Sequence, residues 1–215
     1  MKALMAVTGL MMVGYLLVHS FGNLKVFFGA ETFNHYAEWL KQDFGYPLIP
    51  HGWFIWAFRA LMLAAIVLHI WSAAKLTQRA HAARGSKYAN VKRHEQTYAA
   101  RTMRWGGVIV AAGLLFHLLQ FTTQTITTGF QRGSDPYSMF VASFSLWWIT
   151  LGYLIWVTAV AMHLRHGVWS SLTTLGANTS KRSRANLNIV AWIVAVGWWA
   201  MAMVSPLAVF FGWVG

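Results

Sequence analysis

The 215-residue chain contains no cysteine, only five acidic residues and only four prolines. Without cysteine the chain cannot form disulfides, thiolate metal sites or a cysteine-ligated iron–sulfur cluster. Charged residues make up only 10% of the sequence, whereas about a quarter of the residues in a soluble domain are charged. This composition excludes an ordinary soluble domain.

Hydrophobic residues, 57% of the chain, occur in runs long enough to cross a bilayer, which takes about 20 residues. Lipid offers backbone groups no partner, and segments of strand length with alternating hydrophobicity are absent, so the spans are helices. We predict an all-α, integral membrane five-helix transmembrane bundle that forms a single domain over residues 1–215. The first run is too long for a signal peptide and lacks a small-residue cleavage site, so we expect it to be retained. The predicted helices run approximately over 4–28, 52–76, 105–128, 143–170 and 187–213.

The net charge of +12 is distributed unevenly between the predicted loops. Two loops, between helices two and three and between helices four and five, hold most of the basic residues. Because such a bias marks the cytoplasmic side, we predict a cytoplasmic N-terminus and an outside C-terminus for a multi-pass protein of the cell inner (plasma) membrane. These loops can meet anionic lipid or a partner protein. Their basic residues are Lys75, Arg79, Arg84, Lys87, Lys92, Arg93, Arg101, Arg104, Lys181, Arg182 and Arg184.

Each of the first four apolar runs contains a histidine at membrane depth: His19, His69, His117 and His163. Ionisable side chains at membrane depth are rare and need a partner. His19 lies six residues before Lys25, about 9 Å below the predicted outer end, and His69 and His163 lie near the inner end. The depths therefore predict an inner pair, His69 with His163, and an outer pair, His19 with His117.

Two histidines on different helices at one depth can supply both axial ligands of a haem iron, which leaves no position open for a substrate. We therefore expect two haems b, one for each pair, that carry electrons across the bilayer. For any single histidine, an ordinary hydrogen-bonding role within the bundle is the alternative. A proton-coupled transporter with histidine relays is the alternative for the set, and it predicts no haem absorbance.

Two further residues are candidates for cofactor binding. His166 shares a helix face with His163 three residues earlier and is its competitor as a ligand, or bonds a haem propionate or helps dock a partner. Arg59 lies within helix two, where a guanidinium needs an anion, and a propionate of the outer haem fits that need. Snorkelling of Arg59 to the outer headgroups is the alternative.

Two local sequences resemble a known family. They are HSFGNLK, from His19 to Lys25, and HLRHGVWS, from His163 to Ser170. Together with five spans and histidines on the first four, they resemble the cytochrome b membrane anchor subunit of succinate dehydrogenase and fumarate reductase, in its five-helix, dihaem type. In that family, histidines matching His69 and His163 hold the haem nearer the hydrophilic subunits, and those matching His19 and His117 hold the distal haem.

The resemblance implies a flavoprotein subunit that carries out succinate chemistry, an iron–sulfur subunit docked on the cytoplasmic face, and membrane quinone as the substrate. This chain would then be the electron-transfer, quinone-reactive part of the enzyme and would hold no residue that acts on succinate. An additional small membrane subunit and a higher oligomer stay open. A dihaem cytochrome b of a hydrogenase or formate dehydrogenase is the nearest alternative.

Overall fold

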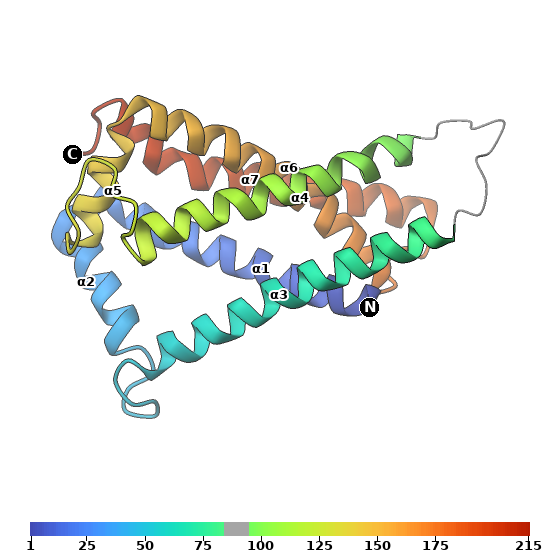
Figure 1. Ribbon diagram of the computed structural model, residues 1–215, viewed down its shortest axis with the longest axis horizontal. Coiled ribbons are helices and arrows are strands. Elements are labelled where there is room, and N and C mark those ends of the chain that lie inside the picture. The colour runs from blue at the N-terminus through green and yellow to red at the C-terminus, as the bar shows by residue number, and fades with distance from the viewer. Residues whose placement is uncertain (84–94) are drawn as a thin grey trace.

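The computed structural model describes residues 1–83 and 95–215, and every regular element among them is helical. Five helices are long and apolar enough to span a membrane, which confirms the predicted all-helical fold with five spans (Figure 1). Shorter helices connect them at one end of the bundle. In chain order the elements are α1 (Lys2–Asn23), η1 (Leu24–Phe28), α2 (Gly29–Gln42), α3 (Trp53–Ala82), α4 (Glu95–His117), η2 (Leu118–Thr122), α5 (Pro136–Phe144), α6 (Trp147–Thr174) and α7 (Lys181–Phe210).

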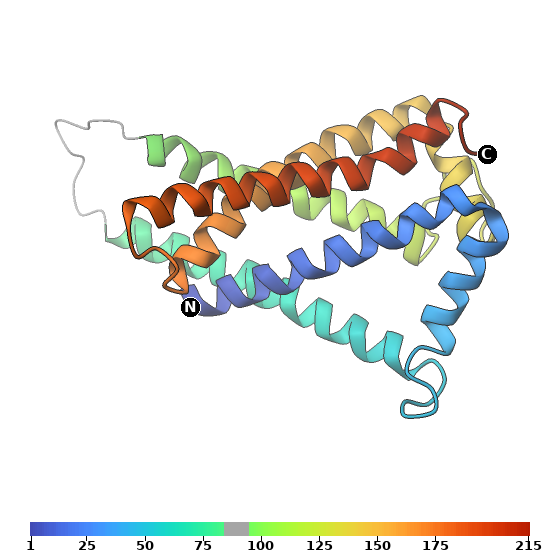
Figure 2. The ribbon, with the colours of Figure 1, turned by 180° about the vertical axis from the view of Figure 1, so that it is seen from behind.

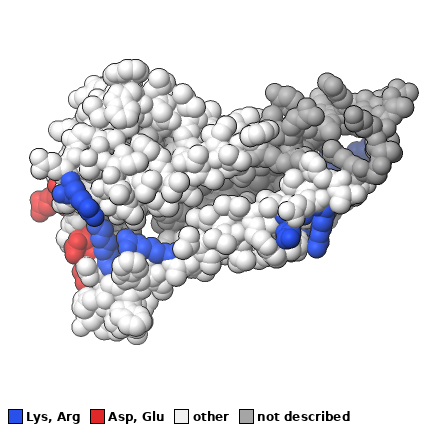
Figure 3. Space-filling model, in the orientation of Figure 1, with Lys and Arg blue, Asp and Glu red and all other residues white. Residues whose placement is uncertain are grey.

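The five spans pack around α1, which contacts α3, α6 and α7, while α4 packs against α6. Helices α1 and α7 form the face of the bundle that is seen in Figure 2. On the opposite face α3 and α4 stand apart, and the surface between them is hollowed (Figure 3). We call this hollow the groove. Helices α3 and α4 are its walls, and α1 and α6 lie beneath it.

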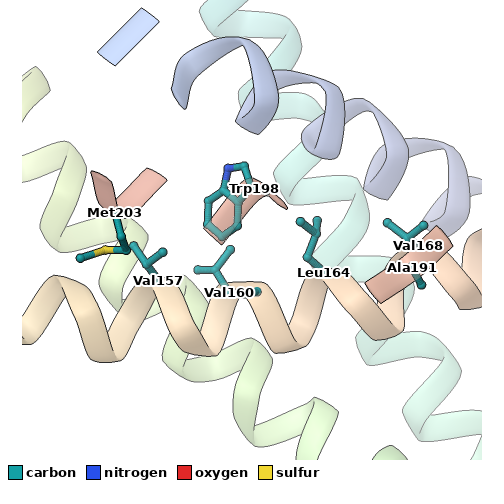
Figure 4. Packing of buried hydrophobic residues seen from close by; sticks show 8 residues of the cluster. Val157, Val160, Leu164, Val168, Ala191, Trp198 and Met203 are labelled. Atoms are coloured by element: carbon teal, nitrogen blue, oxygen red, sulfur yellow. The ribbon is translucent and has the colours of Figure 1, made fainter. Parts of the chain in front are cut away.

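Helices α6 and α7 form the best-packed part of the bundle (Figure 4). Ala191 on α7 is fully buried and lets the helix approach Val168 and Leu164 of α6, as small residues do at helix contacts in membranes. Trp198 joins this core to α1, because its indole N–H donates a hydrogen bond to the Leu16 carbonyl oxygen at 3.2 Å.

Two short helices, α2 and α5, pack on one another at the end of the bundle where α1 ends. The chain turns between α1 and α2 at Gly29, whose φ of 85° is a conformation that glycine adopts without strain. Asn34 on α2 donates to the Asp135 carboxylate at 2.7 Å, and Asp135 caps α5 by accepting from the Ser138 backbone N–H at 3.0 Å. Hydrogen bonds from Ser138 lower the pKa of the exposed Asp135 carboxyl below its usual value.

The predicted helix bounds need correction. Hydropathy marks the part of a helix inside lipid, whereas hydrogen bonding continues beyond it, so α3 runs to Ala82 instead of 76 and α7 begins at Lys181 instead of 187. Helix three begins earlier than 105 and its helical structure ends at Thr122, not 128. The run expected at 143–170 contains the end of α5, a break, and α6. Helix α2 lies in a segment that we expected to be a loop.

The two termini lie at opposite ends of the bundle (Figure 1). All four acidic side chains that the structure describes, Glu31, Glu38, Asp43 and Asp135, belong to the end that contains α2 and α5. The opposite end holds Lys75, Arg79, Lys181, Arg182 and Arg184. Arg84, Lys87, Lys92 and Arg93 lie outside the described residues, as do the side chains of Arg101 and Arg104. Which end faces the cytoplasm stays a prediction.

Candidate cofactor site

The structure brings the four intramembrane histidines together as two pairs. His69 on α3 and His163 on α6 have ring centroids 6.4 Å apart, with an angle of 63° between the ring planes. His19 on α1 and His117 on α4 have centroids 5.9 Å apart, with ring planes at 87°. Each pair joins one wall of the groove to a helix beneath it, and these pairs are the ones that depth predicts.

The two pairs lie at different levels of the bundle. His69 lies beside Gly9, because a Cβ built on Gly9 would meet the His69 Cε1 atom at 3.3 Å. Helix α1 then rises by about 1.5 Å per residue from Gly9 to His19, so the two levels are about 15 Å apart along the helix. The fold thus sets two similar histidine pairs one above the other.

The ring separations fit two imidazoles that share one metal ion. A histidine nitrogen lies about 2 Å from a bound metal such as zinc, which puts the ring centre about 3 Å from it. Two rings on opposite sides of a metal therefore have centres about 6 Å apart, close to both observed distances. The described residues bring no group of three or more His, Asp or Glu side chains together, so each pair offers two protein ligands.

Hydrogen bonds at Nδ1 orient three of the four rings. The His69 Nδ1 atom lies 3.2 Å from the Met5 carbonyl oxygen, and that of His117 lies 3.1 Å from the Tyr153 hydroxyl. The His19 Nδ1 atom lies 3.5 Å from the Tyr15 hydroxyl. Metal-binding histidines characteristically use one ring nitrogen for such a partner and leave the other for the metal. In this pattern Nε2 of each of these rings is the atom that could bind a metal.

The inner pair carries a further sign that it suits a polar or metallic group. Among the described residues, the buried Nδ1 atom of His163 and the buried Ser72 hydroxyl oxygen have no hydrogen-bond partner in the protein. Ser72 lies three residues after His69 on α3 and is completely buried. Buried polar atoms are nearly always partnered. Each of these atoms could accept a hydrogen bond from, or donate one to, a polar group bound at this level.

Glycines leave room beside the inner rings. Gly9 faces His69, and a Cβ on Gly107 would lie 3.7 Å from the His163 Cε1 atom. Gly113 has another purpose, because a Cβ there would overlap the Trp156 indole. Trp156 stacks on His117 at 5.8 Å and donates its N–H to the Val110 carbonyl oxygen at 3.2 Å. Gly113 thus lets α4 approach α6 closely enough to fix the His117 ring.

The other two candidate residues lie away from the paired rings. His166 packs against Trp169 with centroids 6.2 Å apart, and it is His163 whose ring lies in contact with His69. Arg59 is exposed, its guanidinium lies 4.9 Å from the Trp56 ring centre, and it interacts electrostatically with Tyr15 beside His19. Arg59 also lines a cavity of about 610 Å³ with Lys41 and His51. Propionate binding and snorkelling are both compatible with this position.

Sequence reasoning did not identify the residues that hold the rings. Tyr153 is one of seven tyrosines and carries no local signal, and the Met5 partner is a backbone atom. Gln120 was recognisable as a polar residue in an apolar run, and the structure buries it completely in a hydrogen-bond network with Thr128, Ser143 and Tyr153. Compared with known proteins, the chain matches no family model, no curated protein and no solved structure.

Proposed function

We propose that this chain is the dihaem cytochrome b membrane anchor subunit of a succinate:quinone oxidoreductase, with haem b at His69/His163 and at His19/His117. The observation that carries the proposal is the pair of ring separations, 6.4 and 5.9 Å, repeated at two levels of a membrane-spanning bundle. A single contact between two intramembrane histidines could be explained as an ordinary hydrogen-bonding pair. Two contacts, each between a wall of the groove and a helix beneath it, favour a shared kind of ligand.

When bound, haem would supply one-electron transfer. The protein's part is to present imidazoles in fixed orientations and to keep water from the metal. Met5 and Tyr153 hold the rings by their Nδ1 atoms, and Trp156 and Phe121 pack against His117. A haem held by two histidines would carry electrons and would leave no position for substrate. Succinate chemistry would belong to another subunit.

The charge distribution supports the proposed placement in the cell inner membrane, with the N-terminus in the cytoplasm. The end of the bundle with Lys75, Arg79 and Lys181 is basic and the α2–α5 end holds the described acids, in line with the positive-inside rule. The flavoprotein and iron–sulfur subunits would dock on the basic end. Quinone would exchange electrons with the haems from within the lipid. The exposed apolar faces of α3 and α4 suit lipid or an additional membrane subunit.

A pyridine haemochrome assay on the protein purified from its native membrane tests the cofactor. The proposal expects about two haems b per chain and reduced b-type absorbance bands. A colourless preparation would contradict it and favour the proton-coupled transporter. The subunits that copurify test the complex: a flavoprotein with succinate dehydrogenase activity supports the proposal, whereas a nickel or molybdenum subunit would assign the chain to a hydrogenase or formate dehydrogenase.

A further inference from the structure

A buried hydrogen-bond network begins at His117 and extends through three helical segments. The Tyr153 hydroxyl lies 3.1 Å from His117 Nδ1 and 2.6 Å from the Gln120 side-chain oxygen. The Gln120 amide nitrogen faces the hydroxyls of Thr128, at 2.5 Å, and Ser143, at 3.1 Å. The four other residues of this network, Tyr153, Gln120, Thr128 and Ser143, are buried, and Gln120 and Ser143 completely so. Water therefore does not compete for these bonds.

The hydrogen bonds of the structure give one consistent set of donors. The Gln120 amide nitrogen donates to the Thr128 and Ser143 hydroxyl oxygens, and its carbonyl oxygen faces Tyr153. The two hydroxyls suit this role, because Ser143 donates its own proton to the Thr128 carbonyl oxygen at 3.3 Å and Thr128 can donate to the Ser143 hydroxyl oxygen at 2.8 Å. The Tyr153 O–H donates to the Gln120 side-chain oxygen and has no second proton for His117.

It follows that the Tyr153 oxygen accepts a hydrogen bond from His117 Nδ1–H, which leaves the lone pair on Nε2. We propose that Gln120 and Tyr153 are positioning residues that hold His117 in the tautomer able to bind metal and so set the affinity and the reduction potential of the outer haem. The proposal rests on the dihaem function above. It adds residues that act through His117 without touching the cofactor.

At the inner pair the partner of His69 Nδ1 is a backbone carbonyl oxygen and not a side chain, so the inner haem serves as an internal control for the variants below. A carbonyl oxygen can only accept, so Met5 forces His69 Nδ1 to donate whatever the neighbouring side chains are. Thr8 lies 3.3 Å from the same nitrogen, and its hydroxyl donates to the Leu4 carbonyl oxygen at 2.8 Å. The tautomer of His69 is thus set by the backbone, whereas that of His117 depends on two side chains that can be changed.

The first variant is Tyr153→Phe, which removes the hydroxyl oxygen that accepts the hydrogen bond from His117 Nδ1–H and keeps the aromatic ring. His117 then donates less electron density to iron, because a partner at the second ring nitrogen raises the basicity of a histidine ligand. We expect the outer haem to stay bound and its midpoint potential to rise. A tenfold change in the ferric-to-ferrous preference corresponds to about 59 mV for a one-electron couple. The potential of the inner haem should not move.

The second variant, Gln120→Leu, keeps the tyrosine and removes its acceptor. The freed Tyr153 proton can then be donated to His117 Nδ1, which puts the other ring proton on Nε2 and blocks metal binding. We expect a tenfold or larger loss of affinity for the outer haem compared with Tyr153→Phe, the scale of loss seen when the hydrogen bonding of a metal-binding histidine is changed. The Thr128 and Ser143 hydroxyls keep each other as partners in this variant.

The double variant Gln120→Leu/Tyr153→Phe is the decisive test. It has no phenol proton to donate, so it should regain the outer haem and match Tyr153→Phe. A merely structural role for Gln120 predicts additive losses instead. Haem content is read by pyridine haemochrome and the two potentials by redox titration. Tyr137→Phe, which removes the hydroxyl of a tyrosine that packs against Phe33, is the matched control and should leave both haems unchanged.

Each result has one meaning. Recovery of the outer haem in the double variant, with the midpoint potential of the inner haem constant, supports the proposal that Gln120 and Tyr153 set the tautomer of His117. Two haems of unchanged potential in all three variants would overturn that proposal. So would a failure of the double variant to regain the outer haem while the inner haem persists, and either result leaves the dihaem function standing. Absence of haem from the unaltered protein overturns the proposed function itself.

Discussion

Helices α6 and α7 bury a much larger share of their residues in the protein than α3 and α4 do, although all four helices are of similar apolar character. In the most apolar 18-residue window of each helix, 33% of α6 and 39% of α7 is buried, against 6% of α3 and 6% of α4. Yet the thinly packed walls carry His69 and His117, and each wall histidine meets one from the helices beneath. Packing therefore holds together α6 and α7, which we call the frame, whereas the walls keep most of their apolar surface exposed.

The largest expected effect contrasts one tryptophan from each region. Trp198→Ala removes a ring that is only 4% exposed and that donates to the Leu16 carbonyl oxygen. We expect a loss of about 3–5 kcal/mol in the free energy of unfolding, as for other buried aromatic residues. Trp105→Ala on α4, where the ring is 71% exposed, should change it by less than about 0.5 kcal/mol. Reversible unfolding in mixed detergent micelles measures both, and equal losses would contradict the contrast between frame and walls.

A smaller loss in the free energy of unfolding is expected at the contact between α4 and α6. Gly113→Ala puts a methyl group into the Trp156 indole, and overpacking of this kind costs about 1–3 kcal/mol. Because Trp156 stacks on His117, the haem bound at that level should also show altered absorbance. Gly106→Ala on the same helix has open space around its Cβ and should be neutral or slightly stabilising. If both variants behave alike, the Gly113 contact does not hold α4.

The next prediction concerns the charge at the outer end of wall α3. Arg59→Leu removes a positive charge near Tyr15 and His19, and we expect the outer haem's midpoint potential to fall by up to about 59 mV, a tenfold change in the ferric-to-ferrous preference. Redox titration measures this shift. Lys41→Met, in the same cavity, serves as the control for a general loss of charge. An unchanged potential in Arg59→Leu would favour snorkelling over propionate binding.

The smallest effect is expected at the α2–α5 end, outside both regions. Asp135→Ala removes the cap of α5 and the bond from Asn34, which should cost about 1 kcal/mol or less, because the carboxylate is exposed. The pKa of Asp135 is lower in the folded protein, so its contribution is complete above the ordinary Asp value of about 3.9 and is lost as the pH falls through the lower folded pKa. Thermal unfolding of both proteins at pH 7 and in acid measures the difference. A difference that grows in acid would have the wrong sign.

The sequence was sufficient for the number of spans and for the two histidine pairs, because hydropathy and the spacing of His19, His69, His117 and His163 report depth directly. It could not show which apolar helix is packed, since lipid and protein neighbours select the same residue types. Nor could it show Tyr153 or the Met5 carbonyl as ring partners, because these contacts depend on how helices far apart in sequence rotate against each other. The surface helix α2 was missed because it has no long apolar run.

The most direct test of the account is the haem content of single histidine variants. The account predicts one haem per chain in His69→Ala and His163→Ala, with the potential of the outer haem retained, and one haem of the other potential in His19→Ala and His117→Ala. His166→Ala should keep two haems. Loss of a haem in His166→Ala but not in His163→Ala, or loss of the same haem from His69→Ala and His19→Ala, would contradict the pairing on which the account depends.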